Sequence, residues 1–293
     1  GGRPDLGWTG IILAGVVSPD SPSGPMHWRV DSLDGQQTIP VYNALEVADS
    51  PPTELALGRS IEASLENGFG LYRLTRGEGA LLSAGTVLRV ELCSAVDCQS
   101  PADFPATMSL SLPASDDDRA MVWSNTDANL DAHANVIEVL APRTGVYFLT
   151  VDHADNEVGA EFTFVASVEQ VEIRLAEGID QQATLARPGH GAWFARGVAP
   201  GQTLFWTIAA SDESDASPVS YIYRNYADDD GNDIYGDPLL FNDNPVISGS
   251  LLNLPDGIPW PDSLGEATFI WRVVDAQLDG GGGYGITFNG GVR

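Results

Sequence analysis

The chain has 293 residues, 43% of them hydrophobic, which is enough for two domains with cores of their own. Acidic residues number 41 against 14 basic ones, all of them arginine, and the formal net charge is −27. Such a surface repels phosphate, which excludes nucleic acid as a partner, and no apolar run approaches the ~20 residues that membrane insertion requires. The 32 glycines and 19 prolines favour many turns and therefore an all-β fold.

Residues 1–57 form a separate N-terminal β segment. Residues 8–17 are expected to form one apolar strand, with the hydrophobic side chains of Trp8, Ile11, Ile12, Leu13, Val16 and Val17. Asp34-Gly35 lies between two alternating runs and predicts a hairpin, because the tight turn needs positive φ at both central positions. The apolar strand must be buried against a sheet. It either completes the sheet of this hairpin or adds to the sheet of a neighbouring chain, as an assembly strand.

Residues 58–172 consist of short alternating stretches separated by turns. At 86–93, Leu88, Val90 and Leu92 share one face, while Arg89 and Glu91 lie on the other. Further strands are expected at 108–112, 136–140, 146–151 and 162–168. A period of two residues with frequent turns indicates an antiparallel sandwich or barrel.

The two cysteines, Cys93 and Cys98, lie close together in the sequence and belong to no Cys-x-x-Cys motif. A local disulfide at the end of a strand is the expected state, and it implies an oxidising compartment. Two buried free thiols are the alternative, since free cysteine is itself a well-buried residue type.

Residues 173–293 repeat the first pattern. The stretch at 61–75 recurs loosely at 182–196, and the stretch at 145–151 recurs at 267–273. Matching stretches are separated by about 120 residues each time, which indicates two copies of one fold. The sequence therefore predicts three parts, with boundaries at 1–57, 58–172 and 173–293.

The closing strand of the first copy, Ala141-Pro-Arg-Thr-Gly-Val-Tyr147, resembles that of the bacterial pre-peptidase C-terminal (PPC-like) domain. The second copy has Leu264-Gly-Glu-Ala-Thr-Phe269 at this point, without the proline and with phenylalanine in place of tyrosine. The resemblance covers residues 58–293. It implies two tandem jelly-roll-like antiparallel β-sandwiches of a secreted, non-catalytic kind, and some related modules bind calcium or fibrous substrates.

An acidic loop in the second copy is a candidate calcium site. Its oxygen ligands are Asp228, Asp230, Asn232, Asp233 and Asp237, with Gly231 placed to let the chain turn. Ca²⁺ takes six to eight oxygens, which short Asp and Asn side chains on a tight loop can supply. An acidic surface turn is the alternative, because Asp, Asn and Gly dominate turns for conformational reasons alone. A second acidic run, at 116–118, is a weaker candidate.

No catalytic residues can be nominated. The four histidines show no paired metal spacing, and the sequence contains no nucleophile elbow and no lysine for a phosphate loop or a Schiff base. Residues 280–285 match Gly-x-Gly-x-x-Gly by letter, but a strand is expected after them where a dinucleotide site requires a helix. We therefore expect a glycine loop at this point and no enzyme activity.

Two functions fit these features. The first is a non-catalytic structural or adhesive protein, secreted or on the bacterial cell surface, that associates with itself or with other surface proteins. Its subunits would form a filament or other homopolymer joined partly by the N-terminal strand. The second is an accessory module that targets a secreted enzyme to polysaccharide or protein fibres.

Overall fold

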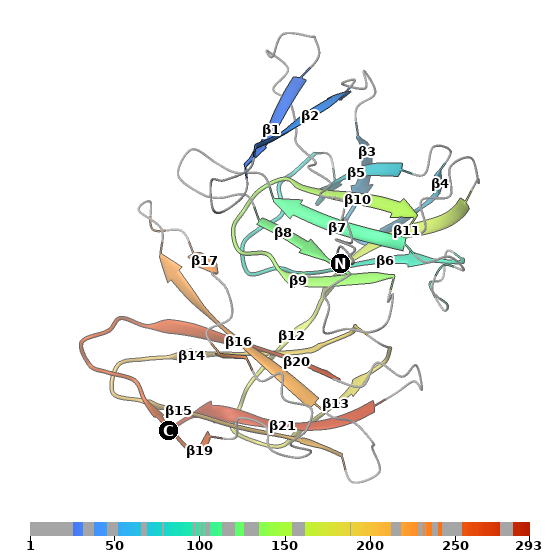
Figure 1. Ribbon diagram of the computed structural model, residues 1–293. Helices are drawn as coiled ribbons and strands as arrows, with labels where there is room; N and C mark the ends of the chain where they lie inside the picture. The colour runs from blue at the N-terminus through green and yellow to red at the C-terminus, as the bar shows by residue number, and fades with distance from the viewer. Residues whose placement is uncertain are drawn as a thin grey trace, which may run out of the picture. The chain divides into compact units, whose positions relative to one another are not determined.

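The computed structural model describes residues 26–31, 38–45, 52–65, 69–77, 79–95, 98, 100, 102, 106–112, 121–125, 135–153, 162–187, 189–211, 218–227, 231, 233–235, 240–241, 254–275 and 284–293. These residues contain strands and no helix, so the all-β prediction is confirmed (Figure 1). The chain divides into two compact units, Gly1–Thr53 and Glu54–Arg293.

In the first unit, β1 (Met26–Asp31) pairs antiparallel with β2 (Thr38–Leu45). Asp31 lies opposite Thr38, and Trp28 lies opposite Val41. This is the hairpin expected around Asp34-Gly35. The proposed assembly strand at 8–17 lies outside the described residues.

The second unit begins with a sandwich of two sheets, one in the order β3-β5-β10-β7-β8 and the other in the order β4-β11-β6-β9. The strand pairings established for these sheets are antiparallel. The bounds are β3 (Thr53–Ala56), β4 (Arg59–Leu65), β5 (Phe69–Thr75), β6 (Val87–Cys93), β7 (Ala106–Leu112), β8 (Met121–Ser124), β9 (Val136–Leu140), β10 (Tyr147–His153) and β11 (Phe162–Val171).

A second sandwich follows, with the orders β12-β14-β20-β16-β17 and β13-β21-β15-β19, while β18 also pairs with β16. Its pairings are antiparallel except for β12 with β14. The bounds are β12 (Ile173–Leu175), β13 (Gln181–Leu185), β14 (Ala192–Val198), β15 (Thr203–Ala210), β16 (Pro218–Ala227), β17 (Asp233–Tyr235), β18 (Leu240–Phe241), β19 (Leu254–Pro259), β20 (Ala267–Asp275) and β21 (Tyr284–Val292).

The two sandwiches have the same strand order, position for position. In the first, Tyr147 of β10 pairs with Leu74 of β5. In the second, Phe269 of β20 pairs with Arg196 of β14. Each pair joins the same two positions of its own sheet order, so the internal repeat of the sequence is a repeat of topology.

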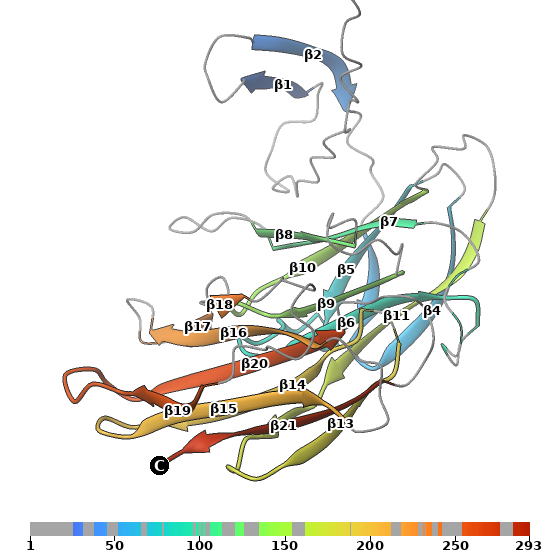
Figure 2. The same ribbon diagram turned by 60° about the horizontal axis from the view of Figure 1, so that its bottom comes forward.

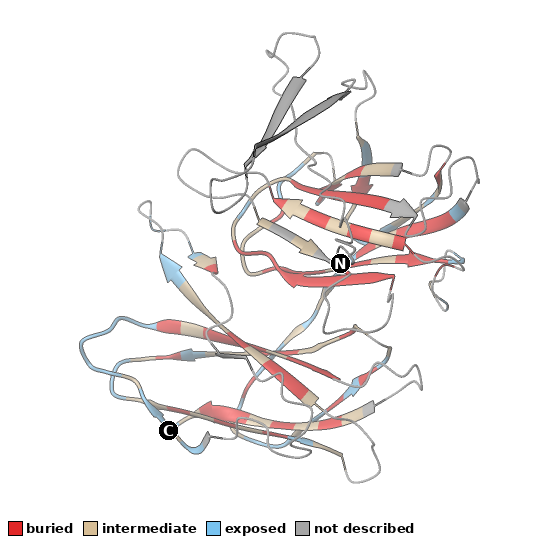
Figure 3. Ribbon diagram, in the orientation of Figure 1, coloured by how far each residue is buried: buried red, intermediate tan, exposed pale blue. Residues whose placement is uncertain are grey.

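Each sandwich buries a core of its own between its sheets (Figure 3). In β7, buried Met108, Leu110 and Leu112 alternate with half-buried residues, as the period of two predicts. The second core is more aromatic: Phe194 stacks on Phe288 with ring centroids 3.9 Å apart, and Trp271 lies next to Phe288 at 5.6 Å. Aromatic side chains of this size supply much of the burial in a small sandwich.

The tyrosine of the closing strand has a structural role. Tyr147 is fully buried, and its hydroxyl donates a hydrogen bond to the carbonyl oxygen of Arg143 at 2.8 Å. Burial is the main reason that the pKa of this phenol is raised. In the second sandwich the equivalent Phe269 makes no such bond and packs edge-on against Trp260, with centroids 5.4 Å apart.

Candidate functional site

The two sandwiches contact each other through outer faces of their sheets. Val87 and Leu140 of the first pack with Trp193, Tyr235 and Ile270 of the second in a small buried cluster. Figure 2 shows the sheet of β6 and β9 next to the sheet of β16 and β20. The backbone N–H of Tyr235 also donates to the carbonyl oxygen of Pro142 at 2.7 Å. This sandwich interface makes one compact unit of the two repeats.

A buried carboxylate lies at the centre of the sandwich interface. The side chain of Glu138, in β9, is fully buried. It accepts hydrogen bonds from Arg89 Nε at 2.6 Å, Trp193 Nε1 at 2.5 Å and the backbone N–H of Gly191 at 2.8 Å. A Cβ on residue 191 would lie only 2.6 Å from Glu138 Oε1, so glycine is required for this close approach. Glu138 therefore joins both sandwiches with three charge-assisted hydrogen bonds.

Arg89 balances the charge of Glu138. It lies opposite Glu138 in the β6–β9 pairing and opposite Glu169 in the β6–β11 pairing. Its guanidinium reaches Glu169 Oε1 at 2.6 Å as well. Burial lowers the pKa of Arg89, but the charge and hydrogen bond of Glu138, aided by Glu169, outweigh it, and the net shift is upward. The arginine stays charged, as a buried carboxylate requires.

A second polar contact crosses the sandwich interface. The ring Nε2 of His190 hydrogen-bonds Glu91 Oε1, and Arg187 lies 3.8 Å from the same oxygen. Burial raises the pKa of Glu91, but the hydrogen bond and charge of His190, followed by the charges of Arg187 and Arg89, lower it below its usual 4.5. The Glu91 carboxylate is thereby held ionised at the interface.

Cys93 and Cys98 are joined by a disulfide. The loop that it closes contacts the second sandwich, where Arg187 donates to the carbonyl oxygen of Cys98. Glu91 and the two sulfurs form the one group of metal-binding type within the described ranges. Because both sulfurs are used in the disulfide, this group offers a metal only the carboxylate of Glu91.

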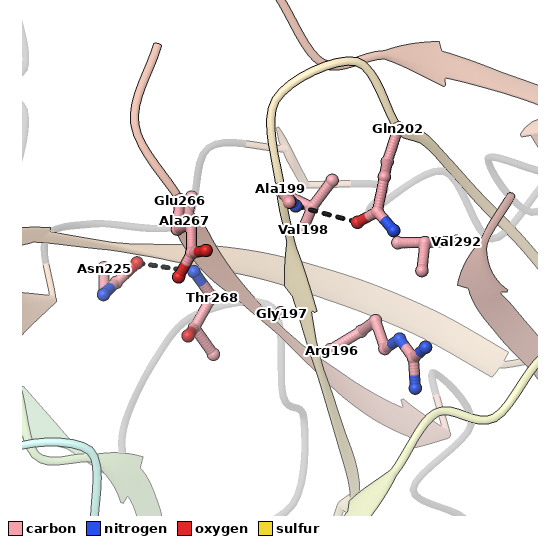
Figure 4. Close-up of a pocket in the computed structure, with 10 residues that line it drawn as sticks. All are labelled: Arg196, Gly197, Val198, Ala199, Gln202, Asn225, Glu266, Ala267, Thr268 and Val292. Atoms are coloured by element: carbon pink, nitrogen blue, oxygen red, sulfur yellow. Dashed lines mark hydrogen bonds between the residues drawn. The ribbon is translucent and has the colours of Figure 1, made fainter. Parts of the chain in front are cut away.

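A polar pocket of about 410 Å³ opens on the second sandwich. Figure 4 shows its lining, contributed by β14, β16, β20, β21 and the turn before β15: Arg196, Gly197, Val198, Ala199, Gln202, Asn225, Glu266, Ala267, Thr268 and Val292. Asn225 Oδ1 accepts from the Thr268 N–H at 2.6 Å, and Gln202 Oε1 accepts from the Ala199 N–H at 2.8 Å. These bonds fix the two amide side chains.

An aromatic and cationic cluster borders the pocket. Arg224, next to Asn225 in β16, lies over the Tyr226 ring at 4.4 Å and over the Trp260 ring at 5.2 Å. The backbone N–H of Trp260 donates to the carbonyl oxygen of Gln202 at 2.7 Å. Tyr226 is one of the exposed large hydrophobic residues, at 37%. The pocket thus lies beside a partly exposed aromatic surface.

The predicted calcium ligands are mostly outside the described residues. Of the five, only Asp233 is described: it is exposed, begins β17, and accepts a hydrogen bond from Asn225 Nδ2 at 2.8 Å. Gly231 has a φ of 81°, the left-handed conformation suited to the expected turn. The acidic run at 116–118 and the glycine loop at 280–285, apart from Tyr284 and Gly285, also lie outside the described residues.

The residues of the sandwich interface were not singled out as a site by the sequence. One signal was available, because Glu138 interrupts the apolar run Val136-Ile-Glu-Val-Leu140 at its centre. A carboxylate in a strand with a burial pattern this continuous needs a buried partner. Nothing in the sequence indicated that this partner would come from the other repeat.

Comparisons with known proteins leave the family open. The chain matches no family model and no curated protein. Among solved structures, it is similar to the CUB1-EGF-CUB2 domains of rat MASP-1, with 10% identity and a TM-score of 0.21 over 82% of this chain and 100% of that one. The same domains of human MASP-1/3 match with 8% identity and a TM-score of 0.19 over 79% and 99%.

A candidate secreted protein from Parabacteroides distasonis matches with 8% identity and a TM-score of 0.19, over 79% of this chain and 87% of that one. None of these structures is named as a PPC-like domain, and similarities at this level support no inference about function. The fold assignment therefore depends on the β-sandwich architecture itself. No helix in the described part of the chain is long and apolar enough to cross a membrane.

Proposed function

We propose that this protein is a non-catalytic structural or adhesive protein of the extracellular space or cell surface, which acts through its shape and its contacts. The observation that carries the proposal is the buried Glu138 interface. Three donors from both sandwiches converge on one carboxylate, and an apolar cluster lies beside it. Satisfied buried polar networks rigidify a structure, so a tandem held in this way keeps its two sandwiches in a set geometry, which suits a scaffold.

Two features support a location outside the cell. The Cys93–Cys98 disulfide belongs to an oxidising compartment. A net charge of −27 keeps the protein soluble in a salty medium. The PPC-like resemblance of the closing strand agrees with both features, and it accounts for a stable sandwich without catalytic groups.

Self-association through the N-terminal strand completes the proposal. The apolar strand that the sequence predicts at 8–17 needs a sheet to cover it, and the sheet of a neighbouring subunit would supply one by strand addition. The test is negative-stain electron microscopy of the full chain and of a variant lacking residues 1–17. We expect filaments or other ordered assemblies from the full chain only.

A full-length variant with Ile12→Asp and Val16→Asp serves as the matched control. It keeps the chain length and puts charges on the apolar strand, so it is expected to behave like the deletion. Unchanged assembly by both variants would falsify the role of the strand, and particles that remain single in every sample would count against a polymer.

The second candidate is a module that targets a secreted enzyme to polysaccharide or protein fibres. The observation that favours it is the polar pocket with its aromatic border. Co-sedimentation with chitin, cellulose and collagen, with and without a chelator, discriminates it from a purely structural protein. Retention on one of these materials supports the candidate, and recovery in the supernatant with all three opposes it.

A further inference from the structure

We propose that two copies of this chain pair face to face through the outer side of the sheet β13-β21-β15-β19 of the second sandwich. The proposal extends the proposed structural function by naming a self-association surface, and this surface does not require the N-terminal strand.

The first sandwich already uses the corresponding sheet in this way. The sheet β4-β11-β6-β9 has the same place in the shared topology, and Val87 of β6 and Leu140 of β9 pack on the second sandwich. The second sandwich takes part in that contact through its other sheet, with Trp193 of β14 and Ile270 of β20. The outer side of β13, β21 and β15 therefore continues the series of stacked sheets, and the next sheet in the series must come from another chain.

The outer face of these three strands is uncharged. In β15, the buried core residues Leu204, Trp206 and Ile208 alternate with the outward residues. By this alternation and the strand pairing, the outward residues are Gln182 and Thr184 of β13, Gly285, Thr287, Asn289 and Gly291 of β21, and Phe205, Thr207 and Ala209 of β15. None of these side chains is ionisable, and Gln182, Thr184 and Ala209 are exposed.

The neutral face differs from its counterpart in the first sandwich. There, the paired positions of β6 and β11 hold Arg89 and Glu169. In the second sandwich the corresponding pair is Phe205 and Gly291. The ion network of the sandwich interface is therefore not repeated, and the partner of this face must itself be neutral.

The net charge of −27 selects the same face of a second copy as that partner. Contact between two copies through acidic surface places like charges opposite each other, which costs several kcal/mol. Contact through two neutral faces avoids this penalty. A basic protein would instead be drawn to the acidic parts of the surface.

Hydrogen bonds fix the polar side chains of this face. Ser211 Oγ donates to Gln182 Oε1 at 2.9 Å, and Gln182 Nε2 donates to Thr287 Oγ1 at 2.8 Å. Asn289 Nδ2 donates to Asp180 Oδ1 at 2.8 Å at the end of the face. Side chains held in this way lose little entropy on association. Amide and hydroxyl groups both donate and accept, so the face can complement itself across a two-fold axis.

The size of the face predicts weak pairing. Its strands are 5, 9 and 8 residues long. With strands about 4.8 Å apart, such a face covers on the order of 400 Å² per copy, below the roughly 800 Å² of a standard interface. We therefore expect a dissociation constant in the micromolar range or weaker. Pairing should strengthen as salt rises, because salt screens the repulsion between two acidic chains.

Sedimentation equilibrium of the full-length Ile12→Asp/Val16→Asp variant tests the proposal, since its apolar strand is blocked. The protein is measured from about 10 to 500 µM, at about 0.02 M and 0.5 M salt. We expect a monomer–dimer equilibrium that shifts toward the dimer at the higher salt.

Charge variants in the same background locate the contact. Ala209→Glu and Ala209→Arg are each expected to weaken the dimer roughly tenfold or more, and an equimolar mixture of the two should recover it. Ala209 is exposed, so the fold should accept both side chains, and thermal unfolding verifies this. Thr184→Glu is a second exposed position on the face. Thr163→Glu is the matched control, because Thr163 is an exposed threonine in β11 of the first sandwich.

A monomer at every concentration and salt would overturn the proposal. So would equal dimerisation by the parent, folded Ala209→Glu and Thr184→Glu, or a mixture of the two Ala209 variants that stays monomeric. The assembly experiment is independent of these results. Filaments that depend on the strand, with no dimer in its absence, leave the structural function and remove this inference. A dimer without filaments removes the role of the strand and keeps the neutral face.

Discussion

Glu138 of the first sandwich accepts a hydrogen bond from the indole Nε1 of Trp193 of the second at 2.5 Å, and both side chains are buried. Glu138 belongs to the sheet β4-β11-β6-β9 of the first repeat, whereas Trp193 belongs to the sheet β12-β14-β20-β16-β17 of the second, so the two repeats meet through sheets that are not equivalent in their shared topology. A carboxylate without solvent is costly unless it is paired and fully hydrogen-bonded. The contact between the repeats is therefore specific, because Glu138 is satisfied only when the second sandwich is in place.

Replacing Glu138 with alanine should strongly destabilise the tandem. The change leaves the Nε of Arg89 and the indole N–H of Trp193 without their acceptor, with Glu169 as the remaining partner of Arg89, and we expect a loss of about 3–5 kcal/mol in the free energy of unfolding. Denaturant unfolding followed by tryptophan fluorescence measures it. Glu169→Ala is the control, because the Glu169 side chain is half exposed and its ion pair with Arg89 contributes within about 1 kcal/mol. Equal losses for the two variants would contradict the central role of Glu138.

Acid should weaken the sandwich interface through Glu91. Its pKa is lowered in the folded protein below 4.5, because the contribution of His190 and the arginines exceeds that of burial. A carboxyl group with a lowered folded pKa stabilises the protein above its unfolded pKa, and this stabilisation is lost as the pH falls through the folded value. We expect Glu91→Gln to be less stable than the parent at neutral pH. The difference in the free energy of unfolding between the parent and Glu91→Gln should become smaller as the pH drops well below 4.5.

Chemical unfolding from neutral to acidic pH measures the free energy of unfolding of the parent and of Glu91→Gln. Taking the difference between the two proteins removes the effect of the other carboxylates. A difference in the free energy of unfolding that stays constant with pH would show that the Glu91 charge does not contribute to stability. Glu62→Gln, on an exposed strand position of the first sandwich, controls for the loss of one negative charge.

The architecture could be predicted from the sequence, whereas the sandwich interface could not. The reason is that a local period describes the two faces of a strand and not the packing of one sheet on another. Alternation reports which face of a strand is apolar, and it correctly placed Leu88, Val90 and Leu92 in a core. The opposite face of the same strand carries Arg89 and Glu91, whose polarity is equally suited to solvent. That this face meets the second repeat depends on how two folded sheets pack together, which no local period encodes.

The disulfide should stabilise the first sandwich by a modest amount. Cys93 and Cys98 are five residues apart, and closing so short a loop contributes roughly 2 kcal/mol in the chain-entropy estimate. Cys98 also accepts a hydrogen bond from Arg187, so its position matters to the sandwich interface. Cys93→Ser with Cys98→Ser should lower the melting temperature to that of the reduced parent. Reductant should have no further effect on the double variant, and a parent unaffected by reductant would oppose the prediction.

Calcium should stabilise the second sandwich if the loop after β16 is a site. A ligand that binds only the folded state raises the free energy of unfolding by about 2.7 kcal/mol when its free concentration is one hundred times its Kd. We expect Ca²⁺ to raise the melting temperature of chelator-treated protein. Asp228→Asn with Asp230→Asn should abolish the increase, while the same change at Asp116 and Asp117 should preserve it. A melting temperature that Ca²⁺ does not change would identify the loop as an acidic turn.

The hydroxyl of Tyr147 should contribute less to stability than its ring. Tyr147→Phe removes the hydrogen bond to the Arg143 carbonyl and keeps the buried aromatic surface, so the expected loss is about 0.5–1.5 kcal/mol. Tyr147→Ala should cost about 3–5 kcal/mol, because it also leaves a cavity. The second sandwich shows why the smaller change is tolerated: Phe269 occupies the equivalent position and packs against Trp260. Phe269→Tyr is the reciprocal variant, and thermal denaturation of all three separates hydrogen bonding from packing. A Tyr147→Phe loss as large as that of Tyr147→Ala would mean that the closing turn depends on the hydroxyl and not on the ring.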